Sequence, residues 1–115
     1  MLTVRHGNDV VEITEPDLVV AKPGDMLDLM ANAHANAIIL RREQFAPEFF
    51  DLKTGLAGEI LQKFSTYDKR LAIVGDFSEV TSKALRDLIF ECNKIGRTIF
   101  VPTVQAALEI FGSQL

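Results

Sequence analysis

The chain has a single cysteine, Cys92, among its 115 residues. No internal disulfide can form, which fits a reducing compartment or a protein that is indifferent to redox state. The N-terminal residues contain no apolar stretch of signal-peptide length, and no segment approaches the roughly 20 apolar residues of a membrane span. From these absences we expect a cytoplasmic protein that does not enter a membrane.

Basic residues are in the minority and form no run. Lysine and arginine number 12 against 16 acidic residues, which gives a net charge of -4. Binding to nucleic acid requires clustered positive charge that displaces counterions, so we expect no nucleic-acid partner. The length fits one domain over residues 1–115, and a hydrophobic content of 48% is that of an ordinary folded protein.

Motifs that would identify a reaction are also missing. His6 and His34 are the only histidines, and neither stands at a recognised spacing from Cys92. The sequence has no cysteine and histidine spacing typical of a metal site, no phosphate-binding loop of the Walker type and no dinucleotide glycine motif. We therefore expect neither a metal nor a cofactor, and we expect both histidines to lie outside the group of polar residues that follows the predicted parallel strands.

Short apolar runs separated by turn residues predict an α/β fold. Gly7 and Asn8 separate two β-prone segments, which indicates an N-terminal hairpin. Three later apolar runs lack alternation and are typical of strands covered on both faces. Amphipathic segments between them predict helical crossovers joining parallel strands in a single-domain mixed sheet. The expected hairpin strands are 2–6 and 10–14, the later strands are 37–40, 71–76 and 98–101, and the helices begin near residues 23, 54, 82 and 103.

The third predicted helix has an apolar stripe at helical spacing. Its members are Leu85, Leu88, Ile89, Cys92 and Ile95, so we expect this face to be buried and Cys92 to be a small core residue.

A polar step interrupts the apolar residues around position 50. Asp51 ends an apolar run, and Lys53, Thr54 and Gly55 precede an amphipathic stretch. This pattern predicts a helix start at which the Thr54 hydroxyl satisfies a free backbone N–H group. The same arrangement, with Lys53 nearby, could hold an anion or accept a phosphoryl group, and the two roles are compatible.

A second group of polar residues follows the predicted parallel strands. Arg41 and Arg42 come after one strand, Asp76 and Ser78 after the next, and Thr103 after the last. Ligands of open α/β sheets usually bind at this edge, so these residues are candidates for holding a small anionic ligand. Alternatively, they are solvated loop charges and helix caps.

Two stretches carry a family resemblance. The residues from Phe49 to Lys63 and those from Leu71 to Ser78 resemble a bacterial domain-of-unknown-function family, number 4180, and the likeness extends over nearly the whole chain. The resemblance itself implies no function.

More distantly, the chain resembles the STAS fold of anti-sigma-factor antagonists. In that fold an Asp-Ser-Ser-Gly-Leu step opens a helix, and Lys53-Thr54-Gly55-Leu56 occupies the comparable place. Thr54 would match the phosphorylated serine, although Leu52 and Lys53 interrupt the spacing from Asp51 and the hydroxyl belongs to threonine.

Three functional hypotheses follow from the sequence. The first is a STAS-like regulatory or binding module that acts through a protein partner or a small anionic ligand. The second is a small enzyme in which Asp76 or Asp51 serves as general base while Arg41 or Arg42 holds an anionic substrate. The third is a self-associating structural module, a possible homodimer.

Overall fold

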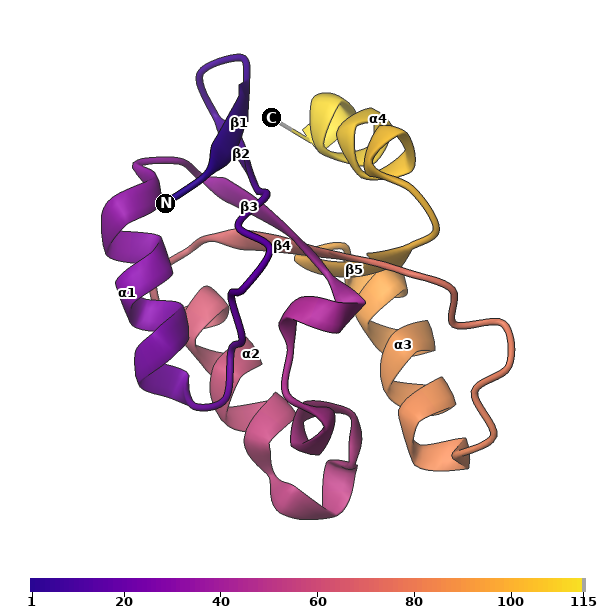
Figure 1. Ribbon diagram of the computed structural model, residues 1–115. Coiled ribbons are helices and arrows are strands. Elements are labelled where there is room, and N and C mark those ends of the chain that lie inside the picture. The colour runs from indigo at the N-terminus through magenta and orange to yellow at the C-terminus, as the bar shows by residue number, and fades with distance from the viewer. Residues whose placement is uncertain (115) are drawn as a thin grey trace.

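The computed structural model describes residues 1–114. Within them the chain folds around one five-stranded sheet whose strands follow chain order from β1 to β5 (Figure 1). The strands are β1 (Thr3–His6), β2 (Val10–Ile13), β3 (Ala37–Arg41), β4 (Arg70–Val74) and β5 (Thr98–Val101). The α-helices are α1 (Pro23–Ala33), α2 (Leu56–Thr66), α3 (Lys83–Ile95) and α4 (Val104–Gln114).

The strands pair as the sequence predicts. β1 and β2 form an antiparallel hairpin in which Val4 lies opposite Glu12. β2, β3, β4 and β5 run parallel to one another. The single α/β domain with an N-terminal hairpin and parallel strands is therefore confirmed. The carboxyl ends of the four parallel strands meet at one edge, which is where the polar residues of interest follow the strands.

The helices divide between the two faces of the sheet. Helices α1, α2 and α3 lie on one face and α4 alone lies on the other (Figure 1). Alternation along the strands supplies both cores: Val11 and Ile38 pack under the three helices, whereas Val10 and Ile39 pack under α4. The C-terminal half of α4 reaches the hairpin turn and lines a hollow with residues 6–10, whereas Leu2 and Val4 on the outer strand stay exposed.

Two details of the helices differ from the sequence-based expectations. Helix α2 begins at Leu56 rather than near Thr54, because Gly55 takes a left-handed conformation with φ of 77° that interrupts the helical path. On α3, Ile95 is 74% exposed and Cys92 is only half-buried, so the expected buried stripe is wrong at its C-terminal end. The helix ends at Gly96, as predicted, with φ of 89°.

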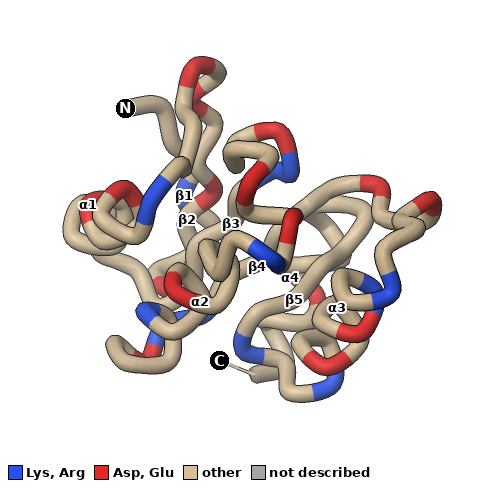
Figure 2. The backbone as a smooth tube through the Cα atoms, turned by 90° about the horizontal axis from the view of Figure 1, so that it is seen from below, with Lys and Arg blue, Asp and Glu red and all other residues tan. Residues whose placement is uncertain are grey.

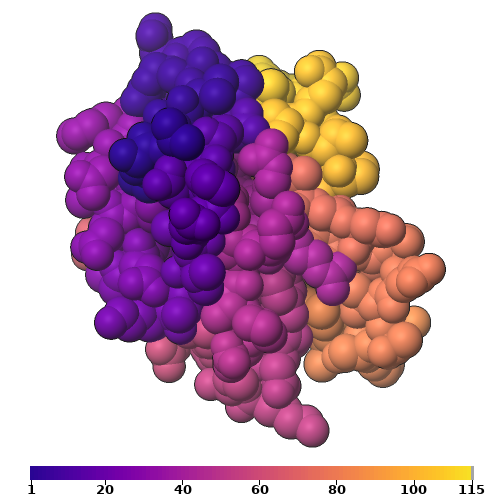
Figure 3. All heavy atoms as spheres, in the orientation of Figure 1, coloured from indigo at the N-terminus to yellow at the C-terminus, as the bar shows by residue number. Residues whose placement is uncertain are grey.

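The surface carries mixed charges. Along the described backbone, Lys and Arg positions alternate with Asp and Glu positions over the loops and helices rather than gathering on one face (Figure 2). In the same residues, no helix combines the length and the apolar character needed to cross a membrane. The first residues of the chain lie on the surface beside the hairpin (Figure 3).

Candidate functional site

Arg42 is the centre of the strand-end surface. It follows β3 as the first residue of a 3-10 turn, Arg42–Gln44. Its guanidinium carbon lies 5.5 Å from the ring centre of Phe50 and 5.0 Å from that of Phe77. Both distances are within the range of cation–π attraction. One guanidinium nitrogen also donates a hydrogen bond to the backbone carbonyl of Asp76, so three separate contacts fix the orientation of the side chain.

Gly75 makes room for this arrangement. A Cβ atom added to Gly75 would lie 2.8 Å from the Cβ of Arg42 and 3.4 Å from its Cδ. Any other residue at position 75, directly after β4, would therefore force the backbone there or at Arg42 to shift, which disturbs the contacts of Arg42 with its aromatic neighbours. Because Gly75 has no side chain, Arg42 can cross from β3 to the loop that follows β4.

The carboxylate of Asp76 is occupied by a neighbour in its own loop. It accepts hydrogen bonds from the Ser78 hydroxyl at 2.6 Å and from the Ser78 backbone N–H at 2.9 Å. These bonds, together with the charge of Arg42, lower the pKa of Asp76 below its ordinary value. A carboxylate with a lowered pKa is a weak base near neutral pH, which argues against Asp76 as a general base.

Arg42 itself has no carboxylate partner within 4.0 Å among residues 1–114. A guanidinium group has five N–H donors, and the Asp76 carbonyl uses only one nitrogen. Two shallow hollows flank the side chain. One, of about 290 Å³, is lined by 75–78 and 100–102. The other, of about 360 Å³, is lined by Arg42, Glu43, Phe45, Pro47 and Phe50. The N–H groups of Arg42 that do not bond to the Asp76 carbonyl therefore lie beside these two hollows.

Arg41 turns to the opposite face of the sheet, so of the two candidate arginines only Arg42 lies with Asp76 and Ser78. Adjacent strand residues point to opposite faces, and Arg41 reaches Glu12 on the α4 side at 2.7 Å. The other oxygen of Glu12 lies 2.9 Å from Nε2 of His6. Burial alone would raise the pKa of Glu12, but the bonds and charges of His6 and Arg41 outweigh it, and the net shift is downward.

Neither histidine lines the hollows beside Arg42, but His6 belongs to this second polar cluster, on the α4 face of the sheet. Its imidazole joins Arg41 through Glu12, whose side chain is only 10% exposed. The sequence signal was a charged residue within the apolar strand Val10–Ile13. A buried charge requires partners, and the hairpin register brings His6 next to Glu12 on the same face.

Thr54 acts as a local cap. Its hydroxyl lies 2.8 Å from the carbonyl oxygen of Glu48 and 2.9 Å from that of Asp51, and it accepts a bond from the Leu56 N–H at 3.2 Å. The Asp51 carboxylate accepts from the N–H of Lys53. The structural role predicted for Thr54 is thus present, one residue before the Gly55 that precedes α2.

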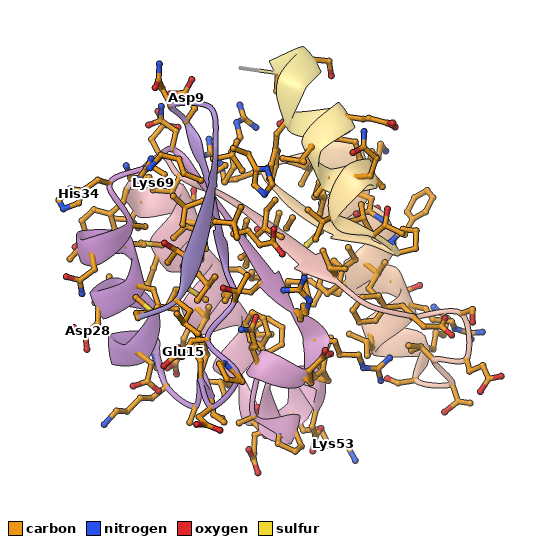
Figure 4. All side chains as sticks on the ribbon, turned by 45° about the horizontal axis from the view of Figure 1, so that its top comes forward. Asp9, Glu15, Asp28, His34, Lys53 and Lys69 are labelled. Atoms are coloured by element: carbon orange, nitrogen blue, oxygen red, sulfur yellow. The ribbon has the colours of Figure 1, made fainter. Side chains whose placement is uncertain are left out.

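Two further candidates, Lys53 and Thr103, lie away from Arg42. Lys53 projects outward from the 3-10 segment that contains it (Figure 4). Thr103 accepts a hydrogen bond from the Ala106 N–H at 3.0 Å and caps α4. Neither of them lines the two hollows beside Arg42. Of the predicted strand-end residues, the structure brings together Arg42, Asp76 and Ser78. The sequence analysis missed three other residues of this site, namely the aromatic residues Phe50 and Phe77 and the glycine Gly75.

Within the described residues, no cluster of three or more histidine, cysteine or acidic side chains could hold a metal ion.

Comparisons with known proteins identify the family of the chain. No curated protein and no solved structure matches the chain. The sequence model described as Domain of unknown function (DUF4180) matches residues 5–110, which is most of the chain and includes Arg42, Gly75 and Asp76. The chain therefore belongs to the DUF4180 family.

Proposed function

We propose that this domain is a binding module that recognises an acidic group, such as a carboxylate or a phosphate, at Arg42. The observation that carries the proposal is the state of the Arg42 side chain. It is held between two phenyl rings, bonded once to a backbone carbonyl, and without a carboxylate partner among the described residues. A guanidinium group that is already oriented loses less entropy on binding an anion than a mobile one does.

The surroundings support binding more than catalysis. Asp76 is engaged by Ser78, and the carboxylate of Asp51 accepts from the backbone of its own turn. Neither carboxylate is placed with Arg42 around a single deep cavity. The enzyme hypothesis therefore has weaker support than the binding hypothesis. A regulatory role and the more distant STAS likeness remain part of this proposal.

The negative charges near Arg42 set the expected strength of binding. Asp76 and Glu43 both lie beside the hollows, and their charges oppose that of an incoming anion. Binding of a simple anion should therefore be weak. A ligand that adds a flat or apolar portion beside Phe77 and Phe100 would bind more tightly, because its burial there contributes as well.

An NMR titration tests the proposal. The probes are inorganic phosphate, acetate, and a capped peptide with one phosphoserine, which separates a free anion from an acidic group carried by a protein. We expect saturable shifts of the Arg42 side-chain N–H signals and of the backbone amides 75–78. Arg42→Gln should abolish them. Arg86→Gln, on the exposed polar side of α3, is the matched control and should bind like the parent protein.

The same titration can overturn the proposal. Shifts that are scattered over the surface, or shifts of the backbone amides 75–78 that persist in the Arg42→Gln variant, would show that Arg42 is not a recognition site. In that event its role would be to cover the rings of Phe50 and Phe77.

A further inference from the structure

The two edge strands of the sheet, β1 and β5, differ in how far their outer sides are covered. All four residues of β5 are buried, and the side chain of Asn93 on α3 bonds both the N–H and the C=O of Phe100. Along β1, by contrast, Thr3, Val4 and Arg5 are exposed. Unpaired edge strands are places where another chain can add a strand, and natural proteins normally protect them.

The hairpin register shows which backbone groups of β1 are free. The N–H of Thr14 donates to the C=O of Leu2 at 2.9 Å, which makes this a hydrogen-bonded pair. Hydrogen-bonded and non-hydrogen-bonded pairs alternate along an antiparallel ladder. Val4 and His6 therefore bond to β2, and the N–H and C=O groups of Thr3 and Arg5 point away from the sheet. Within residues 1–114 no strand lies beyond them.

β1 is short, at four residues, which itself limits pairing, but the residue types that usually protect an edge strand are missing. β1 contains no proline and no lysine, both of which discourage pairing between edges. Its one arginine does not guard the edge, because the Arg5 guanidinium is turned toward the end of α1. There it donates to the carbonyl of Ala33 at 2.8 Å and lies 3.4 Å from that of His34. The outer side of β1 is therefore open along Thr3–Arg5.

We propose that β1 pairs with β1 of a second copy of this chain, antiparallel and around a two-fold axis at Val4. In this register Thr3 exchanges two backbone hydrogen bonds with the partner's Arg5, and Arg5 exchanges two with the partner's Thr3. All of the outward-pointing groups of Thr3 and Arg5 are then satisfied. The two sheets join into one, with Val4 facing its symmetry mate as a non-hydrogen-bonded pair, the closer of the two pair types.

Side-chain chemistry favours a second copy in this register. Each Arg5 lies opposite an uncharged threonine, whereas a two-fold axis at Arg5 would place like charges directly opposite one another, which is destabilising. Leu2 and Val4 share one face of the strand and are 60% and 45% exposed. Around the axis at Val4, the exposed Leu2 and Val4 side chains of the two copies lie next to one another on one face, and each Leu2 lies opposite the partner's His6. An isologous contact of this kind closes as a dimer and does not propagate.

The size of the contact sets its strength. A strand of only four residues on each side buries less than the roughly 1,200 Å² that marks the lower end of stable interfaces. We therefore expect a reversible dimer that forms at high protein concentration. This inference is independent of anion binding at Arg42, which lies at the carboxyl ends of the parallel strands.

Sedimentation velocity across a concentration series, combined with amide hydrogen exchange, tests the pairing. Thr3→Pro removes an N–H group that points outward, so it deletes a contact between copies and no bond between β1 and β2. Thr3→Val is the matched control that keeps the donor. Val4→Lys places two ammonium groups opposite each other across the axis. We expect the parent and Thr3→Val to associate, and Thr3→Pro and Val4→Lys to associate at least tenfold more weakly with unchanged melting temperatures.

Hydrogen exchange should identify the strand directly. Protection of the Thr3 and Arg5 amides should rise with protein concentration, whereas the Val4 and His6 amides should be protected at every concentration. A parent protein that stays monomeric up to millimolar concentration would overturn the proposal, as would a dimer that persists in the variants. If Thr3→Pro disturbs the fold, the exposed substitution Val4→Lys decides the outcome alone.

Discussion

The side chain of Asn93 does for Phe100 what a neighbouring strand would do. Its Oδ1 accepts from the Phe100 N–H at 2.7 Å, and its Nδ2 donates to the Phe100 carbonyl at 3.2 Å. A carboxamide has the same donor and acceptor as a peptide group, so one side chain on α3 completes a position of the β5 edge. The bonds also tie the helix to the strand beside which it packs.

Replacing Asn93 should lower the stability of the protein. In Asn93→Ala the N–H and C=O of Phe100, a residue that is 5% exposed, lose their partners. We expect the free energy of unfolding to fall by about 1–3 kcal/mol. Urea denaturation followed by circular dichroism measures the loss. Asn32→Ala is the control, because the Asn32 side chain donates to the carbonyl of Asp28 at an exposed position within its own helix, α1. Equal stability of the two variants would contradict the assignment.

Gly75→Ala should disturb the Arg42 site specifically. The new methyl group would lie 2.8 Å from the Cβ of Arg42, so the backbone at Arg42 or at position 75 must shift, which disturbs the position of the guanidinium between the rings of Phe50 and Phe77. We expect a cost of about 1–3 kcal/mol in stability and weaker binding of phosphate. Denaturation and the NMR titration measure the two effects separately.

Gly58→Ala is the matched control for that substitution. Gly58 lies in α2 with no atom within 4 Å of an added Cβ. Alanine should there stabilise the helix by about 0.5–1 kcal/mol and leave anion binding unchanged. A Gly75→Ala variant that resembles this control in both measurements would show that Arg42 accommodates a side chain at position 75.

Ser78→Ala should raise the pKa of Asp76. The hydroxyl of Ser78 is the main cause of the lowered pKa, followed by the Ser78 backbone N–H, which the substitution retains. The pKa should therefore move part of the way back toward its ordinary value. Carbon-detected NMR of the Asp76 carboxyl group over a pH titration measures the shift. The other carboxyl groups in the same spectra serve as internal controls, and an unchanged Asp76 would contradict the hydrogen-bond assignment.

Because of Glu12, the free energy of unfolding should decrease as the pH falls into the acidic range. Its folded-state pKa is lowered, so its contribution is fully present above the unfolded-state pKa. The contribution is lost as the pH falls through that value toward the folded-state pKa. Glu12→Gln should therefore destabilise the protein at pH 7, by about 1–3 kcal/mol, and less in acid. Denaturation at several pH values tests this. Glu79→Gln, at an exposed loop position, should leave the pH profile unchanged.

Much of the fold could be predicted from the sequence because its signals are local. The apolar run 37–40, which lies within β3, has the pattern of a strand covered on both faces, and Gly96 ends α3 for a stereochemical reason that one residue carries. The exposure of Ile95 could not be predicted in the same way. Helical spacing places a residue on a face, but the neighbouring elements decide how far along the helix that face is covered.

The candidate site was only partly predictable because its geometry depends on the pairing of strands. The sequence places Arg41 and Arg42 side by side, and alternation along β3 then sends them to opposite faces. The rings of Phe50 and Phe77 come from segments 27 residues apart in the chain, and no local pattern shows that they enclose one guanidinium group. Likewise, the partnership of His6 with Glu12 follows from the hairpin register.

Thr54 should contribute to stability through its hydroxyl, which connects the 3-10 segment Leu52–Thr54 to the start of α2. Thr54→Val keeps the shape of the side chain and removes the hydroxyl, so we expect a loss of about 0.5–2 kcal/mol. Thr54→Ser should retain most of the stability. Chemical denaturation measures both, and Thr81→Val, at another exposed threonine, is the control.

The same contacts determine what modification of Thr54 would do. The hydroxyl hydrogen donates to a carbonyl of Glu48 or Asp51, and a phosphoryl group would replace that hydrogen. The carbonyl oxygens would then face a group of their own sign, so phosphorylation should loosen the turn rather than strengthen it. Phosphorylated and unmodified protein, compared by hydrogen exchange over 48–56, should differ in that direction. Slower exchange in the phosphorylated form would contradict this account and favour a helix-terminal anion site at α2.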